Sequence, residues 1–254
     1  PRRWASPLRA RPCHSPHAHA QAAARIAVPT VDRLAIRVVS DSNHDIFISG
    51  EAPKNVGVER VRGLPPPRSQ KTLHNEWGLS LHLQSQKGSE QRNHLLDFGY
   101  TPELLNHNIE MLDVDPTKID GLIVSHGHLD HFGGLIGFLK KHRDKMPADL
   151  TLYSGGEDNF CMRHSRTAKP GVFNEWGALD RRAIAAQRVK TVLAEQPAVI
   201  GGHIFTTGAI PRRSIEKILP NTMVELAVRA DGLGCNASHF SPAELQGKIV
   251  ADEH

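Results

Sequence analysis

The feature that most constrains this chain is an apolar run that leads directly into a cluster of histidines. Residues 119–124 form the run, and it ends at Ser125. The residues after it read His-Gly-His-Leu-Asp-His, and Gly133 and Gly134 open a segment with helical periodicity that extends to Lys145. The sequence therefore predicts a buried strand, a tight loop and a helix, in that order.

The loop from Ser125 to His131, here called the histidine loop, has donors suited to a metal site. His126 and His128 are two positions apart, so in extended backbone both side chains project to the same side and can grip one ion. Asp130 and His131 follow where the loop turns into the helix, and they can face a second ion. Imidazole with carboxylate suits zinc, and also iron or manganese. The alternative is a polar loop that binds nothing, in which Asp130 caps the helix.

Strand-like and helix-like patterns alternate around the histidine loop. Thr101, Pro102 and Glu103 indicate a helix start, because a hydroxyl caps the first turn, proline fits it and an acid favours the positive end of the helix dipole. Residues 50–72 are rich in proline, glycine and charge, which predicts a surface loop. We expect strands at 33–39, 79–84, 94–98, 119–124, 150–153, 189–193, 199–205 and 223–228, and helices at 101–112, 133–145, 178–187 and 214–219. This order predicts a layered α/β sandwich.

The net charge of +4 is concentrated at one end of the chain. Residues 1–31 hold five arginines, no lysine and no acid, so the remainder has a net charge of −1. A folded nucleic-acid-binding surface needs clustered Lys and Arg, which the remainder does not supply. We interpret residues 1–32 as a disordered tail or targeting remnant and residues 33–254 as one domain, and we expect no nucleic-acid partner.

Neither a membrane span nor a disulfide framework is expected from this composition. No apolar run approaches the ~20 residues that a spanning helix needs. Cys13, Cys161 and Cys235 show no CxxC spacing, so we expect Cys161 and Cys235 to be ordinary buried thiols. Few cysteines favour a cytoplasmic protein, with an exported one as the alternative. We expect Trp77 and Trp176 to be packing residues.

The histidine loop resembles the signature of a known family. Residues 126–131 are similar to the HxHxDH motif of the metallo-β-lactamase superfamily, and residues 95–99 resemble its upstream Asp-x-Gly motif. Three further segments resemble the branch of dihydropterin-methyl-ribofuranosylaminobenzene-phosphate synthase-like metallohydrolases, namely 76–80, 153–158 and 206–212. The resemblance extends over residues 33–254.

The resemblance implies a fold, a chemistry and roles for individual residues. The fold would be an αββα sandwich with a one- or two-metal site at one edge of its sheets. His126 and His128 would bind the first metal, and Asp130 and His131 the second, with Asp130 also the candidate catalytic residue. A metal-bound hydroxide would attack the substrate, because coordination lowers the pKa of water toward ~7. Asp97 would lie behind the ligands and orient one of them by hydrogen bonding.

The chain departs from the superfamily pattern after the histidine loop. The family completes its metal site with a later histidine, a bridging aspartate and a final histidine, and the Cys-Ser-His-Ala-Gly-like segment of this branch is not found in the sequence. We therefore expect an αββα sandwich that is incomplete in its C-terminal half. The alternative is that His203, His239, Asp252 or His254 supplies the missing donors, with His203 favoured because it follows two glycines and begins a strand.

Two main classes of function remain open. The first is a metal-dependent hydrolase that acts on an ester, amide or phosphoester with one or two zinc ions, or with iron or manganese. The second is a metal-binding chain that catalyses nothing, and iron redox chemistry at the same ligands is a third possibility. We expect a small-molecule substrate and no membrane partner. Because an incomplete sandwich leaves a sheet face uncovered, we also expect self-association through that face.

Overall fold

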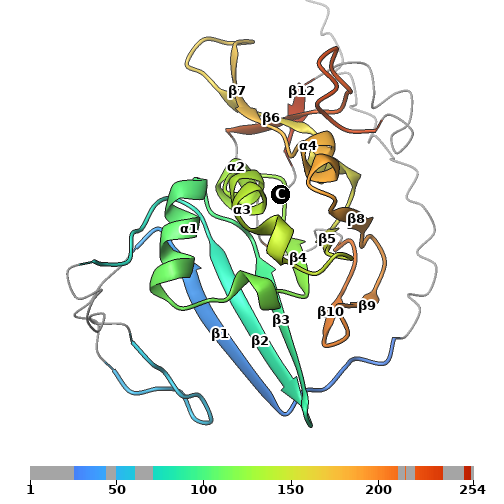
Figure 1. The fold of residues 1–254 in the computed structure, drawn as a ribbon. Helices are drawn as coiled ribbons and strands as arrows, with labels where there is room; N and C mark the ends of the chain where they lie inside the picture. The colour runs from blue at the N-terminus through green and yellow to red at the C-terminus, as the bar shows by residue number, and fades with distance from the viewer. Residues whose placement is uncertain are drawn as a thin grey trace, which may run out of the picture.

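The computed structural model of the chain describes residues 26–43, 50–60, 71–210, 215, 221–236 and 249–252. These residues form a mixed α/β fold with two main sheets and a separate two-stranded hairpin (Figure 1). The predicted α/β fold class is confirmed. The tail and the Arg-rich segment that precede residue 26 lie outside the described residues, and so does nearly all of the helix expected at 214–219.

The larger sheet has six strands, and it carries the histidine loop at the end of one of them. Its order is β1-β2-β3-β4-β5-β8, antiparallel from β1 to β3 and parallel from β3 to β8. The strands are β1 (Arg33–Ser40), β2 (Ser80–Lys87), β3 (Glu90–Leu96), β4 (Gly121–Val124), β5 (Thr151–Ser154) and β8 (Lys190–Leu193). The carboxyl ends of parallel strands share one sheet edge, so the loops after β3 and β4 are neighbours.

Helices cover one face of this sheet and enclose the main core (Figure 1). The helices are α1 (Pro102–Met111), α2 (Leu129–Phe132), α3 (Leu135–His142) and α4 (Arg181–Ala186), with short 3₁₀ turns at η1 (Pro116–Lys118), η2 (Arg143–Lys145) and η3 (Glu157–Phe160). Thr101 caps α1 as predicted, because its side chain accepts a hydrogen bond from Leu104 N. Leu95, Leu122 and Leu152 lie opposite one another on β3, β4 and β5 and are fully buried within this core.

The smaller sheet has four strands in the order β12-β11-β6-β7. They are β6 (Met162–Arg166), β7 (Phe173–Gly177), β11 (Thr222–Glu225) and β12 (Ile249–Ala251). Figure 1 shows β6, β7 and β12 grouped beyond the histidine-loop end of the larger sheet. Residues far apart in the sequence thus approach the histidine loop from a second layer.

A hairpin of β9 (Ala198–Ile200) and β10 (Ile204–Thr206) packs over His94, on the face of the larger sheet that the helices do not cover. A Cβ on Gly201 would lie 2.0 Å from His94 Nε2, so only glycine allows this approach. His94 is fully buried, and neither of its ring nitrogens has a hydrogen-bond partner among the described residues. Burial lowers the pKa of His94 to about 4, because the charged imidazolium cannot be hydrated there.

The structure differs from the predicted elements in three places. The strand expected at 199–205 is instead the β9–β10 hairpin, because Gly201 and Gly202 adopt positive φ and turn the chain. The range 133–145, where one helix was expected, holds α3 followed by the 3₁₀ turn η2, and a separate helix, α2, precedes it at Leu129–Phe132. Strands β6 and β7 were not predicted, because their polar residues alternate weakly, and β12 was not predicted, because it has only three residues. No helix among the described residues is long and apolar enough to cross a membrane.

Candidate functional site

The histidine loop is held at the end of β4 by close backbone contacts. A Cβ on Gly127 would lie 2.3 Å from Asn159 O, and a Cβ on Gly133 would lie 2.1 Å from Tyr100 O. Phe98 N donates a hydrogen bond to His131 O over 2.7 Å, and this bond ties the loop after β3 to the loop after β4. Glycine at these positions is therefore a steric requirement of the loop and not only a source of backbone freedom.

Asp97 is the residue that organises the histidine loop. It follows β3, is fully buried, and adopts φ 58°, a left-handed conformation that aspartate tolerates better than most residues. Asp97 Oδ1 accepts a hydrogen bond from Ser125 N, and Oδ2 accepts from Ser125 Oγ and from His131 Nδ1, each over 2.7 Å. The structure thus places Asp97 behind the loop, in contact with one predicted ligand.

His131 is held between two carboxylates. Its Nδ1 lies 2.7 Å from Asp97 Oδ2, and its Nε2 lies 3.4 Å from Asp130 Oδ2. Burial alone would lower the pKa of His131, but the hydrogen bonds and charges of Asp130 and Asp97 outweigh it and raise the pKa to about 9. Burial likewise favours neutral Asp130, yet its hydrogen bond with His131 and the charge of that ring keep the pKa of Asp130 below its usual value.

The three imidazoles of the histidine loop gather at one place. The ring centroids of His126 and His131 are 4.1 Å apart, and those of His126 and His128 are 4.5 Å apart. Asp130 is buried beside them, and its Oδ1 has no hydrogen-bond partner among the described residues. The structure therefore brings all four predicted ligands together. An unsatisfied buried carboxylate oxygen of this kind carries a free-energy cost.

A carboxylate next to the smaller sheet reaches this cluster. Asp252, directly after β12, places Oδ2 2.8 Å from His128 Nε2 and 2.7 Å from Arg163 Nε. Arg163 is almost fully buried on β6, and its Nη1 donates to the backbone oxygens of Asp158 and Cys161. Burial lowers the pKa of Arg163, and the facing charges of Asp252 and Asp158 act against this. Of the two alternative donors that lie within the described residues, His203 and Asp252, it is Asp252 that contacts the histidine loop.

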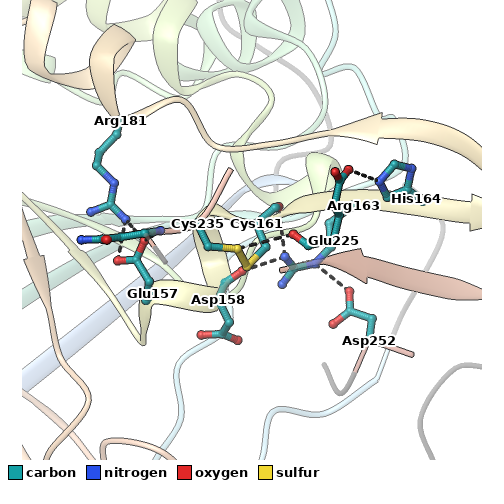
Figure 2. The surroundings of a disulfide bond; sticks show 10 residues. Glu157, Asp158, Cys161, Arg163, His164, Arg181, Glu225, Cys235 and Asp252 are labelled. Carbon is teal, nitrogen blue, oxygen red and sulfur yellow. Dashed lines mark hydrogen bonds and ion pairs between the residues drawn. A yellow bond between two sulfur atoms is a disulfide. The ribbon is translucent and has the colours of Figure 1, made fainter. Parts of the chain in front are cut away.

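Cys161 and Cys235 form a disulfide next to Arg163 (Figure 2), so our expectation that they are unpaired thiols is wrong. Their Cα atoms are 4.4 Å apart although 74 residues separate them in sequence. Glu157 lies nearby, pairs with Arg181, and accepts a hydrogen bond from Asn236 N. Short-range motifs such as CxxC cannot reveal this pairing, because the fold and not the spacing brings the two cysteines together.

The other alternative donors do not join the site in the described residues. His203 lies in the turn between β9 and β10, where its Nδ1 is 3.0 Å from Ser85 Oγ and its Nε2 is 3.7 Å from Glu90. Glu90 begins β3 and Asp97 follows the other end of it, which puts them roughly 20 Å apart at the rise of a β-strand. His239 and His254 lie outside the described residues.

The donor types of the site fit a divalent metal, but their present arrangement does not complete a coordination sphere. Within the described part of the chain, no group of three or more His, Cys, Asp or Glu side chains is arranged to hold an ion. Both nitrogens of His131 face carboxylates, and His128 Nε2 faces Asp252. An ion would therefore have to replace at least some of these contacts.

Two groups at the site were missed or misjudged from the sequence. Arg163 lies in a polar segment with no distinguishing pattern, so nothing in the sequence marked it as buried. Trp77 was expected to pack internally, yet 56% of it is exposed, and it stacks on Trp176, which in turn lies beside His128. The resemblance of residues 76–80 to a family segment was the only sequence signal for this second group.

Three comparisons describe what the chain is similar to. A family model for the metallo-beta-lactamase superfamily matches residues 89–145. The chain is 32% identical over 73 residues to the 7,8-dihydropterin-6-methyl-4-(beta-D-ribofuranosyl)-aminobenzene-5'-phosphate synthase of Methanocaldococcus jannaschii. These 73 residues are 29% of this chain and 25% of that protein. The chain thus spans a quarter of this relative's length.

Among solved structures, MEM-A1, a subclass B3 metallo-beta-lactamase from a soil metagenome library, is 17% identical with a TM-score of 0.29, over 51% of this chain and 45% of that one. The metallo-beta-lactamase MIM-1 from Novosphingobium pentaromativorans is 14% identical with a TM-score of 0.28, over 62% and 49%. The family match covers β3, Asp97, β4 and the whole histidine loop, the same residues whose geometry is described above. Through this segment, the chain is similar to the metallo-beta-lactamase superfamily.

Proposed function

We propose that this chain is a metal-dependent hydrolase whose site is centred on the histidine loop. The observation that carries the proposal is the convergence of three imidazoles and a buried, partly unsatisfied carboxylate after one strand. The match of residues 89–145 to the metallo-beta-lactamase superfamily model supports a hydrolase-type function. Zinc is the ion we propose, as one or two ions, because imidazole and carboxylate donors suit it; iron and manganese suit the same donors.

In this proposal each residue of the site has a distinct role. His126, His128, Asp130 and His131 would hold the metal, and the bound metal would supply positive charge that makes water more acidic and polarises the substrate oxygen. Asp97 orients His131 through Nδ1 and fixes the loop through Ser125. Asp130, kept as a carboxylate at neutral pH, can accept a proton from the attacking water.

The substrate class we propose is a small molecule with an ester, amide or phosphoester bond. The curated relative is named a synthase, and the chain covers only a quarter of it, so its reaction is not transferred here. We also propose that copies of this chain associate through β1. This is the edge strand of the described sheet, and Leu34, Ile36 and Val38 on it are 53%, 58% and 51% exposed.

The disulfide bears on the cellular compartment of the protein. We expected a cytoplasmic protein with an exported one as the alternative. A bond between Cys161 and Cys235 supports the exported alternative, because disulfides persist in oxidising compartments and are rare in the cytosol.

A non-catalytic metal-binding chain is the second candidate. It is favoured by the carboxylates that already occupy both nitrogens of His131 and Nε2 of His128. If these contacts persist when a metal binds, the cluster would have few donors left for an ion and for a reactive water. The experiment that follows separates the two candidates.

The test measures metal content and hydrolysis in the same preparations of the full chain. Zinc per chain is determined by mass spectrometry, and p-nitrophenyl acetate and bis-p-nitrophenyl phosphate are the substrates. The variants are His126→Ala and Asp97→Asn, and the matched control is His142→Ala, whose ring bonds Asn106 on the far side of the core. A background variant without His14, His17 and His19 removes metal bound by the tail.

Loss of a side chain that supports a metal ligand typically lowers metal affinity or activity by ~10–100-fold, and we expect Asp97→Asn to lose metal and activity within that range. We expect His126→Ala, which removes a ligand itself, to lose at least as much of both. The control should retain both. Equal activity in all variants would reject the hydrolase. Metal that depends on His126 without any hydrolysis would favour the non-catalytic candidate.

A further inference from the structure

We propose that the exposed indole of Trp77, stacked on Trp176 beside His128, is a shelf on which a planar aromatic ring of the substrate docks. The role of this shelf in hydrolysis rests on the proposed function, whereas the binding of an aromatic ring to it can be tested without catalysis. The aromatic shelf is defined here as Tyr100, Trp77 and Trp176. Its chemistry identifies the class of ligand as a small molecule with a flat aromatic or heteroaromatic group.

The shelf leads directly to the candidate site. The rings of Trp77 and Trp176 are nearly parallel, at 13°, with centroids 5.3 Å apart. Trp176 lies 5.1 Å from the ring of His128, and Trp77 lies 6.1 Å from Tyr100. A row of rings therefore extends from Tyr100 to His128. A ligand ring placed on Trp77 would hold the rest of a small molecule within reach of the histidine loop.

The loop that carries Trp77 is positioned by the site itself. Glu76 accepts hydrogen bonds from Tyr100 N and Thr101 N over 2.9 and 2.7 Å, which joins it to the start of α1. Gly78 has φ 132°, and a Cβ there would lie 2.3 Å from Asp130 O. Trp77 thus stands between two residues that are anchored to the helix start and to the histidine loop. Its orientation is pre-organised, which reduces the entropy lost when a ligand binds.

Exposure is the observation that separates a shelf from a packing contact. Trp77 is 56% exposed, whereas a tryptophan that only fills a core is mostly buried. Indoles prefer stacked or edge-on partners and carry a large apolar surface, so an exposed stack beside polar histidines is the combination that small-molecule sites use. β7 brings Trp176 from the smaller sheet, so the shelf exists only when the two sheets are assembled.

The first test measures binding without catalysis. Calorimetric titration of the full chain with 2-naphthoate is compared with titration by cyclohexanecarboxylate, which has the same charge but no aromatic ring. Trp77→Leu keeps apolar surface and removes the ring, and Trp77→Phe keeps a ring. The matched control is Phe205→Leu, because Phe205 on β10 is also an exposed aromatic residue, 44% exposed, outside the shelf. Circular dichroism verifies that each variant is folded.

We expect 2-naphthoate to bind more tightly than cyclohexanecarboxylate. Trp77→Leu should weaken 2-naphthoate about fivefold, the range that aromatic stacking contributes, while Trp77→Phe and Phe205→Leu stay within twofold of the original chain. Absence of 2-naphthoate binding, or equal binding by Trp77→Leu and the original chain, would overturn the shelf.

The second test links the shelf to hydrolysis. The ratio of kcat/KM for 2-naphthyl acetate to that for cyclohexyl acetate is measured in the original chain, in Trp77→Leu and in Phe205→Leu. We expect Trp77→Leu to lower this ratio about fivefold and the control to leave it unchanged. Ring-dependent binding without any hydrolysis would support the shelf and reject the hydrolase. Hydrolysis with an unchanged ratio in Trp77→Leu would reject the shelf as a substrate site.

Discussion

The two layers of this molecule are held together by different forces. Among the described residues, the larger sheet and its helices share a core of twenty buried apolar residues, whereas the smaller sheet has a core cluster of three, Cys161, Val224 and Cys235. Two of those three form the disulfide, and the buried Arg163–Asp252 ion pair lies beside it. The first layer is stabilised by apolar burial, which is non-directional and additive over area. The second depends on a few specific bonds.

This difference matters because the candidate site lies where the layers meet. Asp97, Asp130 and the three histidines come from the first layer, while Asp252 and Trp176 come from the second. Loss of the second layer should therefore leave the histidine loop folded but remove its outer contacts.

The largest expected effect comes from breaking the disulfide. In the chain-entropy description, a bond that closes a 74-residue loop stabilises by about 4 kcal/mol, so the Cys161→Ser/Cys235→Ser double variant should lose that order of stability. Hydrogen exchange should rise in β6, β7 and β11 and remain slow in β3 and β4. Cys13→Ser is the control. Equal loss of protection in both layers would contradict the comparison.

Next in size is a cavity in the first core. Leu122→Ala removes a fully buried side chain of β4 between β3 and β5, and we expect a loss of roughly 3 kcal/mol in the free energy of unfolding measured with urea. Ile36→Ala on β1, where the side chain is 58% exposed, should cost under about 1 kcal/mol. Similar losses in both variants would show that the uncovered face is in fact packed.

Acid should destabilise the first layer through His94. Its pKa is about 4 in the folded chain and near 6.5 when unfolded, so the unfolded state binds the proton first as the pH falls. The contribution of neutral His94 to the free energy of unfolding is therefore fully present above pH 6.5 and declines toward pH 4. The total decline is on the order of 3 kcal/mol if the folded structure does not relax. His94→Leu should flatten this decline in urea unfolding, whereas His107→Leu should not. An unchanged slope in His94→Leu would refute the assignment.

A substitution on the exposed face of β1 should have the smallest effect on stability. The same substitution should clearly change the association of the chain. Ile36→Lys places a charge among the exposed apolar side chains of an edge strand, which opposes pairing with a second copy. We expect sedimentation velocity to show oligomers of the original chain and monomers of the variant, with stability changed by under about 0.5 kcal/mol. A monomeric original chain would end the proposal of self-association.

The sequence predicted the first layer well because its signals are local. The apolar run before Ser125, the Thr101 cap and the HxHxDH motif each act over a few residues, and each lies where it was expected. Polar strands such as β6 and β7 carry no such periodicity, because what buries them is the partner layer and not their own pattern. A pair such as Cys161 and Cys235 carries no local signal either.

By itself, then, the sequence determined the α/β class, the strand–loop–helix around residues 121–142 and the residues of the histidine loop that are candidate metal donors. Only the tertiary structure decided that Asp97 supports His131, that Asp252 reaches His128, that two distant cysteines pair and that the exposed Trp77 stacks on Trp176. The physical reason is range. Backbone propensity, capping and motif spacing act within a few residues, whereas hydrogen bonds and stacking between distant segments exist only after long-range strand pairing has brought those segments together.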